Sequence, residues 1–78
     1  MRVFVTGGSG FIGGAVVRQL VRRGHRVTSL ARTEAGAEVA RRNGAEVLLG
    51  DMNDRDALER GVAGAQAVVH AASPASAE

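Results

Sequence analysis

Short apolar runs recur along the chain, separated by longer segments in which apolar and polar residues mix. Each run is bounded by glycine or polar residues, which is typical of a strand buried in a parallel sheet. Four such strands are predicted, at residues 2–6, 25–31, 45–49 and 67–71.

The segment after the first strand carries apolar residues at helical spacing. Ile12, Val16 and Val17, followed by Leu20 and Val21, fall on one face. This pattern predicts a helix from about residue 10 to residue 23, and the glycine that follows is suited to end it.

The next two helices are predicted from the residues that begin them. Thr33 is suited to cap the second helix, which we expect to end at the glycine before the third strand. Asp54 is suited to cap the third helix. Leu58 and Val62 are predicted to face inward from this helix, and the glycines at residues 61 and 64 are predicted to end it.

Strands that alternate with helices through short connections predict a parallel sheet with right-handed crossovers. We therefore expect an α/β fold of Rossmann type, with three layers, three helices and four strands in the order 3-2-1-4. In that order the first two helices cover one face of the sheet and the third covers the other alone. The fourth strand keeps an unpaired apolar edge, which favours association with a second copy into a homo-oligomer.

A glycine-rich sequence, Thr6-Gly7-Gly8-Ser9-Gly10-Phe11-Ile12-Gly13, connects the first strand to the first helix. In such a turn the backbone N–H groups face outward at the positive end of the helix dipole, which favours a phosphate. Gly7 permits the tight turn, Gly10 lets a diphosphate approach the backbone, and Gly13 lets the helix pack against the strand. The pattern predicts a dinucleotide site, and a loop without a ligand is the alternative.

The end of the second predicted strand indicates which dinucleotide is bound. Sites for NAD carry an acidic residue here that binds the ribose hydroxyls, whereas this chain has Ala31 followed by Arg32. Without a carboxylate a 2′-phosphate is not repelled, and the guanidinium can donate two hydrogen bonds to it. We therefore predict NADP rather than NAD, and the alternative is that Arg32 is an ordinary solvated residue.

Two further pairs of residues are predicted near the ligand. Asp51 and Met52 follow the third strand, where the carboxylate can accept a hydrogen bond from an adenine amino group and the thioether can cover the ring. The alternative is that Asp51 or Asn53 helps to cap the third helix. Ala71 and Ala72 end the fourth strand and are small enough to leave space for a ribose or diphosphate.

Composition argues against several other classes of function. The 78 residues include no cysteine, so neither disulfides nor thiolate chemistry is predicted, and the cytoplasm is the expected compartment. The net charge is +2, the ten basic residues are scattered arginines, and the aromatic residues are two phenylalanines, which disfavours nucleic acid as a partner. No apolar run is long enough to span a membrane. His25 and His70 have no second metal-ligating residue nearby, so no metal site and no catalytic residue are predicted.

Together these residues resemble the extended and atypical short-chain dehydrogenase/reductases, which include nucleotide-sugar epimerases, dehydratases and NADP-linked ketone reductases. The resemblance rests on four stretches in collinear order, namely Thr6-Gly7-x-x-Gly10-Phe11-Ile12-Gly13, Arg23-Gly24-His25-x-Val27, Gly50-Asp51-Met52 and Val68-Val69-His70-x-Ala72. It implies that Gly7, Gly10, Phe11 and Ile12 contact the diphosphate, Arg32 the 2′-phosphate, Asp51 and Met52 the adenine, and Ala71 and Ala72 the ribose.

The resemblance does not extend to the family's catalytic pair. That pair belongs to a Tyr-x-x-x-Lys motif, and this chain contains neither tyrosine nor lysine. We therefore expect an NADP-binding N-terminal portion of such an oxidoreductase, inactive alone. Residues 1–72 form a partial dinucleotide-binding domain in this interpretation, and residues 73–78 form a truncated tail.

Other interpretations remain open from the sequence. The chain is alternatively a non-enzymatic module that binds or senses a nucleotide, or a structural half-domain that associates with a partner. A methyltransferase-type cofactor site also uses a glycine-rich first turn, but Thr6 and the Phe11-Ile12 pair favour a nicotinamide dinucleotide.

Overall fold

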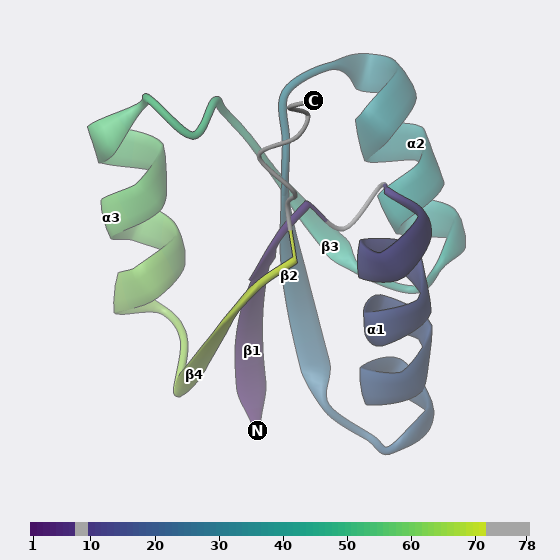
Figure 1. Ribbon diagram of the computed structural model, residues 1–78. Helices are drawn as coiled ribbons and strands as arrows, with labels where there is room; N and C mark the ends of the chain where they lie inside the picture. Colours follow the sequence, from purple (N-terminus) through teal and green to yellow (C-terminus); the bar gives the residue numbers. More distant parts are fainter. Residues whose placement is uncertain (8–9, 72–78) are drawn as a thin grey trace.

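The elements of the computed structural model alternate between strand and helix as predicted. The structure describes residues 1–7 and 10–71. Its elements are β1 (Arg2–Thr6), α1 (Phe11–Arg22), β2 (Arg26–Ala31), α2 (Glu34–Arg42), β3 (Glu46–Leu49), α3 (Arg55–Ala63) and β4 (Ala67–His70). The strands are parallel and lie in the order β3-β2-β1-β4. The predicted Rossmann-like α/β fold is therefore confirmed. Figure 1 shows α1 and α2 on one face of the sheet and α3 alone on the other.

Several element ends lie one residue from the predicted positions, because helix caps use the intervening residues. Gly10 has extended backbone and is the N-cap of α1, so the helix begins at Phe11. Gly24 and Gly44, with φ of 88° and 98°, end α1 and α2. The next residue in each case donates its N–H to a helix carbonyl, from His25 to Leu20 at 3.0 Å and from Ala45 to Ala40 at 3.0 Å. Residues 25 and 45 therefore belong to the caps, and β2 and β3 begin one residue later.

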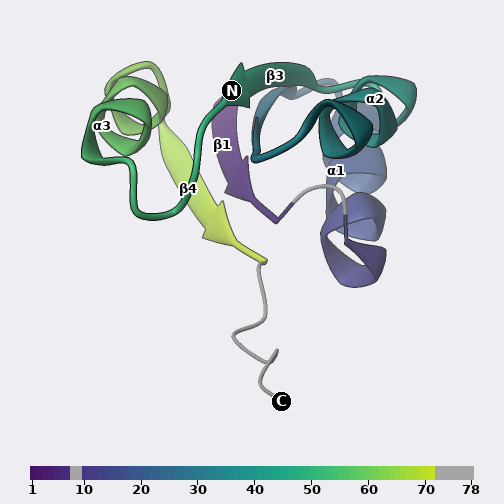
Figure 2. The same cartoon turned by 90° about the horizontal axis from the view of Figure 1, so that it is seen from above.

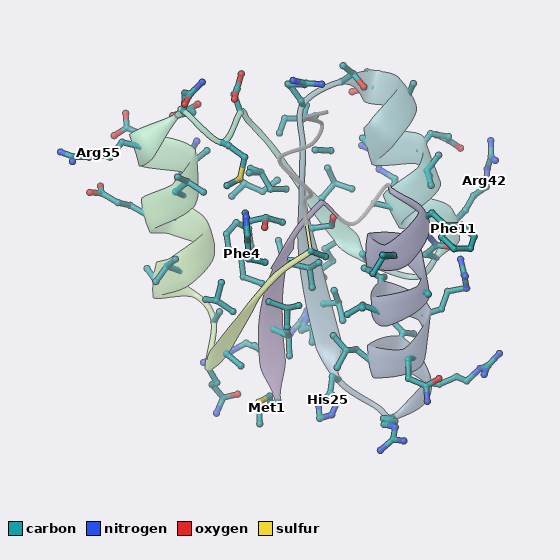
Figure 3. All side chains as sticks on the ribbon, in the orientation of Figure 1. Met1, Phe4, Phe11, His25, Arg42 and Arg55 are labelled. Carbon is teal, nitrogen blue, oxygen red and sulfur yellow. The ribbon has the colours of Figure 1, made fainter. Side chains whose placement is uncertain are left out.

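The two faces of the sheet bury different side chains. On the face covered by α1 and α2, the core consists of Val3, Val5, Val17, Val27, Ala40 and Ala45. On the face covered by α3, the core is smaller and consists of Phe4, Leu30 and Ala57. Alternate residues of β1 thus enter opposite cores, and α3 is held mainly by one phenylalanine ring (Figure 3).

The buried face of α3 differs from the prediction. Ala57 and Gly61 are the buried residues, Leu58 is half-buried, and the Val62 side chain is 51% exposed. A Cβ added to Gly61 would lie 2.3 Å from Cζ of Phe4, so the helix rests on the ring through its smallest residue. Gly61 therefore lies inside the helix rather than at its end. The helix ends at Ala63, and its C-cap is Gly64.

The strand β4 forms one edge of the sheet. Within residues 1–7 and 10–71 it pairs on one side only, with β1. Figure 2 shows that α3 leaves part of this strand uncovered. Val68 is 51% exposed and His70 is also exposed, so the prediction that His70 lies on a buried strand was wrong. Ala71 lies beyond the end of β4 but still donates its N–H to the Thr6 carbonyl at 2.9 Å.

Candidate functional site

An open cleft of about 460 Å³ lies at the carboxyl ends of β1, β2 and β3. It is lined by Gly7, Leu30, Ala31, Arg32, Thr33, Gly36, Gly50, Asp51, Met52 and Asn53. In open parallel sheets, ligands bind outside the carboxyl ends of the strands. The fold therefore brings Gly7, Arg32, Asp51 and Met52 together at one site, although the sequence separates them by up to 45 positions (52 − 7).

The turn after β1 presents an uncapped helix start near this cleft. Gly7 has a φ of 80°, which favours glycine, and its carbonyl accepts the N–H of Gly10 at 3.1 Å. Gly10 has no side chain to cap α1, and the first turn of α1 contains no acidic residue. The first N–H groups of a helix have no partner within the helix, so those of α1 are available to an anion.

The other two helix starts are already capped by side chains. The hydroxyl of Thr33 accepts the N–H of Gly36 at 3.1 Å, and the carboxylate of Asp54 accepts the N–H of Ala57 at 3.1 Å. Both caps were predicted from the sequence and are confirmed. Of the three helices, α1 is thus the one whose N-cap residue makes no side-chain hydrogen bond to the first turn.

The remaining residues predicted around the diphosphate do not line the cleft with their side chains. Phe11 is 95% exposed and Ile12 is 68% exposed, and Phe11 lies on the outer side of α1 (Figure 3). Their contribution to a phosphate site is therefore confined to their backbone N–H groups. Gly13 is buried, as expected for a position where α1 packs closely. Ala71 is half-buried against the larger core, and Ala72 lies outside the described residues.

Arg32 lies in the connection between the end of β2 and the start of α2. Ala31 is 3% exposed and ends the strand, and the exposed Arg32 follows it directly at the wall of the cleft. The positive end of the α2 dipole adds to the charge of the guanidinium. Glu34 in the first turn of α2 opposes this field, although its carboxylate lies 3.7 Å from the Arg41 guanidinium.

Asp51 orders the loop between β3 and α3. One oxygen of its carboxylate accepts the N–H of Asn53 at 3.0 Å, and its carbonyl accepts the N–H of Asp54 at 2.9 Å. The cap of α3 is Asp54 and not Asp51, so the capping alternative for Asp51 is not supported. Its second carboxylate oxygen remains able to accept a hydrogen bond from a ligand in the cleft.

Two features of the site have no counterpart in the sequence prediction. Thr6 and His70 end neighbouring strands, and Oγ1 of Thr6 lies 2.6 Å from Nδ1 of His70. The signal that could have revealed this contact is the pairing of the two strand ends, because paired residues point to the same face. The second feature is Gly50, which directly follows β3. A Cβ added there would lie 2.5 Å from the Ala57 Cβ, so only glycine at this position lets α3 pack so close to the end of β3.

A second groove, of about 340 Å³, lies between β3 and the end of α3 at the amino ends of the strands. Arg2, Arg26, Glu46 and Arg60 are among its lining residues, and Arg26 is paired with Glu46 at 3.5 Å. This groove has neither a glycine turn nor a helix start, so its chemistry does not match the predicted nucleotide site.

Two other kinds of site are absent from the part of the chain that the structure describes. No three histidine, cysteine, aspartate or glutamate residues come together there as metal ligands would. None of the helices in residues 1–7 and 10–71 has the length and apolar character needed to cross a membrane.

The sequence matches the NAD dependent epimerase/dehydratase family over residues 3–78. It is 43% identical over 77 residues to the 4-hydroxy-2-methyl-3-oxo-4-farnesyl-3,4-dihydroquinoline-1-oxide ketoreductase of Stigmatella aurantiaca, covering 99% of this chain and 23% of that protein. The chain spans about a quarter of the length of the curated relatives it matches.

Solved structures of related sequence share this fold. A Bacillus halodurans protein provisionally assigned as an NAD-dependent epimerase/dehydratase superposes with a TM-score of 0.82 at 27% identity, over 95% of this chain and 34% of that one. The structure of AtPrR2 with NADP⁺ and (+)pinoresinol superposes with a TM-score of 0.76 at 31% identity, over 94% of this chain and 26% of that one.

Proposed function

The chain belongs to the NAD dependent epimerase/dehydratase family, and from this membership we propose that it is the NADP-binding N-terminal portion of an oxidoreductase of that family. The observation that carries the proposal is the cleft, where the glycine turn, Arg32 and Asp51 meet at the carboxyl ends of parallel strands. Residues 1–72 form a partial dinucleotide-binding domain in this proposal, and residues 73–78 are its tail.

The residues of the cleft fit the parts of a dinucleotide. The N–H groups at the start of α1 bind the diphosphate, since the N-cap Gly10 has no side chain to cap them. Asp51 and Met52 hold the adenine, and Ala71 and Ala72 lie beside the ribose. When bound, the cofactor supplies hydride transfer, and the residues of this chain bind and orient it.

NADP is the proposed cofactor rather than NAD. The position that carries an acidic residue in NAD sites holds the buried Ala31, and the exposed Arg32 follows at the cleft wall. The relative AtPrR2 has been solved with NADP⁺, which supports a dinucleotide of this kind. A chain without tyrosine or lysine lacks the family's catalytic pair, so we expect binding without turnover.

Calorimetric titration of the purified chain with NADP and NAD tests this proposal directly. We expect NADP to bind more tightly than NAD, and Gly10→Ala to weaken the binding of both by about tenfold or more. Among the described residues, an added Cβ at Gly10 would have only the Gly7 carbonyl oxygen nearby, at 3.5 Å, so the variant is expected to remain folded. The new methyl group would instead stand where the diphosphate approaches the backbone.

Gly64→Ala is the matched control for this titration. It makes the same chemical change at the C-cap of α3, where the nearest atom to the new Cβ lies 3.8 Å away. Its affinity for NADP is expected to equal that of the parent chain. A folded parent chain that binds neither nucleotide at millimolar concentration would contradict the proposal.

The open edge of β4 supports a second candidate function, that of a self-associating half-domain. β4 has one paired neighbour in the described part of the chain, and Val68 beside the open edge is 51% exposed. We expect light scattering to show a dimer at high protein concentration and Val68→Lys to shift it to a monomer. A parent chain that stays monomeric at every concentration would rule this association out.

A further inference from the structure

A side-chain hydrogen bond joins the ends of β1 and β4 directly behind the glycine turn. Thr6 is 3% exposed and is the last residue of β1, while His70 is the last residue of β4. Oγ1 of Thr6 and Nδ1 of His70 lie 2.6 Å apart. Thr6 is also fixed through its backbone, since its carbonyl accepts the N–H of Ala71 at 2.9 Å.

The two atoms share one hydrogen bond, and the tautomer of the imidazole decides which of them donates. The Thr6 hydroxyl donates when Nδ1 carries no proton, and its oxygen accepts when Nδ1 carries one. A neutral imidazole that accepts at Nδ1 carries its proton on Nε2.

The bond lies at one end of a short chain of contacts that leads to the start of α1. Thr6 precedes Gly7, whose φ of 80° sets the direction of the turn. The carbonyl of Gly7 accepts the N–H of Gly10, and the carbonyl of Gly10 accepts the N–H of Gly14 at 2.7 Å. A rotation at Thr6 would therefore change the direction of the N–H groups at the helix start.

The hydroxyl of Thr6 has one hydrogen-bond partner among the described residues, and that partner is His70. Removing the imidazole would leave a buried hydroxyl that has to rotate or remain unsatisfied. The position of Thr6 thus depends on a residue that is 64 positions away in the sequence.

We propose that His70 is a positioning residue of the nucleotide site, which fixes Thr6 and thereby the direction in which the turn presents its N–H groups to a diphosphate. The proposal rests on the proposed function for its ligand. It assigns His70 no contact with the cofactor, because its effect is transmitted through the Thr6 hydroxyl.

A double-mutant cycle on NADP affinity tests the proposal. Thr6→Val and His70→Leu each remove one partner, and each is expected to weaken binding by up to about tenfold. The double variant is expected to bind no more weakly than the weaker single variant, because one interaction has been removed in all three. Additive losses in the double variant would overturn the proposal.

Conservative variants separate positioning from general support of the fold. Thr6→Ser keeps the hydroxyl, and His70→Asn can place an amide oxygen where Nδ1 stood, so both are expected to bind NADP within about threefold of the parent. Ser29→Ala is the matched control, because it removes a buried hydroxyl on β2 that has no partner in the described structure. A His70→Leu variant that unfolds at lower urea concentration yet keeps its NADP affinity would show a merely structural role.

Nuclear magnetic resonance of the free chain separates failure of this inference from failure of the proposed function. The amide resonances of Gly7 and Gly10 are expected to shift in Thr6→Val and His70→Leu but not in Ser29→Ala. If those amides do not move, the inference is wrong whether or not the parent binds NADP. If they move and the parent does not bind NADP, the proposed function alone is wrong.

Discussion

Replacing Gly61 by alanine is expected to destabilise the protein by about 2 kcal/mol, even though alanine is the better helix former by about 1 kcal/mol. The added Cβ would lie 2.3, 2.4 and 2.6 Å from three carbons of the Phe4 ring. That ring is 1% exposed and is enclosed between the sheet and α3, so it cannot swing into solvent. The helix must therefore move away from the sheet, which opens the smaller of the two cores.

Urea denaturation followed by circular dichroism measures this effect. Gly64→Ala is the control on the same helix, and its free energy of unfolding is expected to stay within about 0.5 kcal/mol of the parent value. Adding Phe4→Leu to Gly61→Ala is expected to recover part of the loss, because the smaller side chain leaves room for the methyl group. An unfolding midpoint for Gly61→Ala at or above that of the parent would show that the contact with Phe4 does not limit this position.

Replacing Arg32 by alanine is expected to abolish the preference for NADP over NAD. NADP differs from NAD by the 2′-phosphate, and Arg32 is the cationic side chain at the wall of the cleft. Hydrogen bonds to charged groups contribute roughly 1.5–3 kcal/mol. Because Arg32 is exposed and solvent screens its charge, we expect the lower value, which corresponds to about a tenfold loss of NADP affinity. The affinity for NAD is expected to change little.

Parallel titrations of both nucleotides into the variant and the parent measure this change. Arg42→Ala is the matched control, since it removes the same charge from a side chain that points away from the molecule on α2 (Figure 3). It is expected to leave the ratio of the two affinities unchanged. If Arg32→Ala binds NADP as tightly as the parent does, Arg32 is a solvated residue and the specificity for NADP has another source.

Features of the fold that depend on neighbouring residues could be predicted from the sequence. Thr33 and Asp54 cap their helices as expected, because a cap is decided within four residues. Arg32 and Asp51 follow strand ends and line the same cleft, since parallel strands bring their carboxyl ends to one edge of the sheet. Gly24 ends α1 with a positive φ for an equally local reason.

Features that depend on distant partners were missed. The face of α3 that packs inward depends on the Phe4 ring, which lies too close to residue 61 for a side chain larger than that of glycine. The spacing of apolar residues alone favoured Val62, which is exposed. The contact between Thr6 and His70 requires the register of two strands separated by three helices. The glycine motif indicates where N–H groups face a ligand, but it does not predict that the side chains of Phe11 and Ile12 lie in solvent.

The described residues that line the cleft all lie between Gly7 and Asn53, whereas β4 begins at Ala67. During synthesis on the ribosome, these residues therefore emerge before the strand that carries His70. A dinucleotide that binds at this stage stabilises β1, β2 and β3 against unfolding by mass action, before the fourth strand can pair. Under the proposed function, ligand binding to the early strands is expected to raise the yield of folded chain, because β1, β2 and β3 then provide the edge onto which β4 docks.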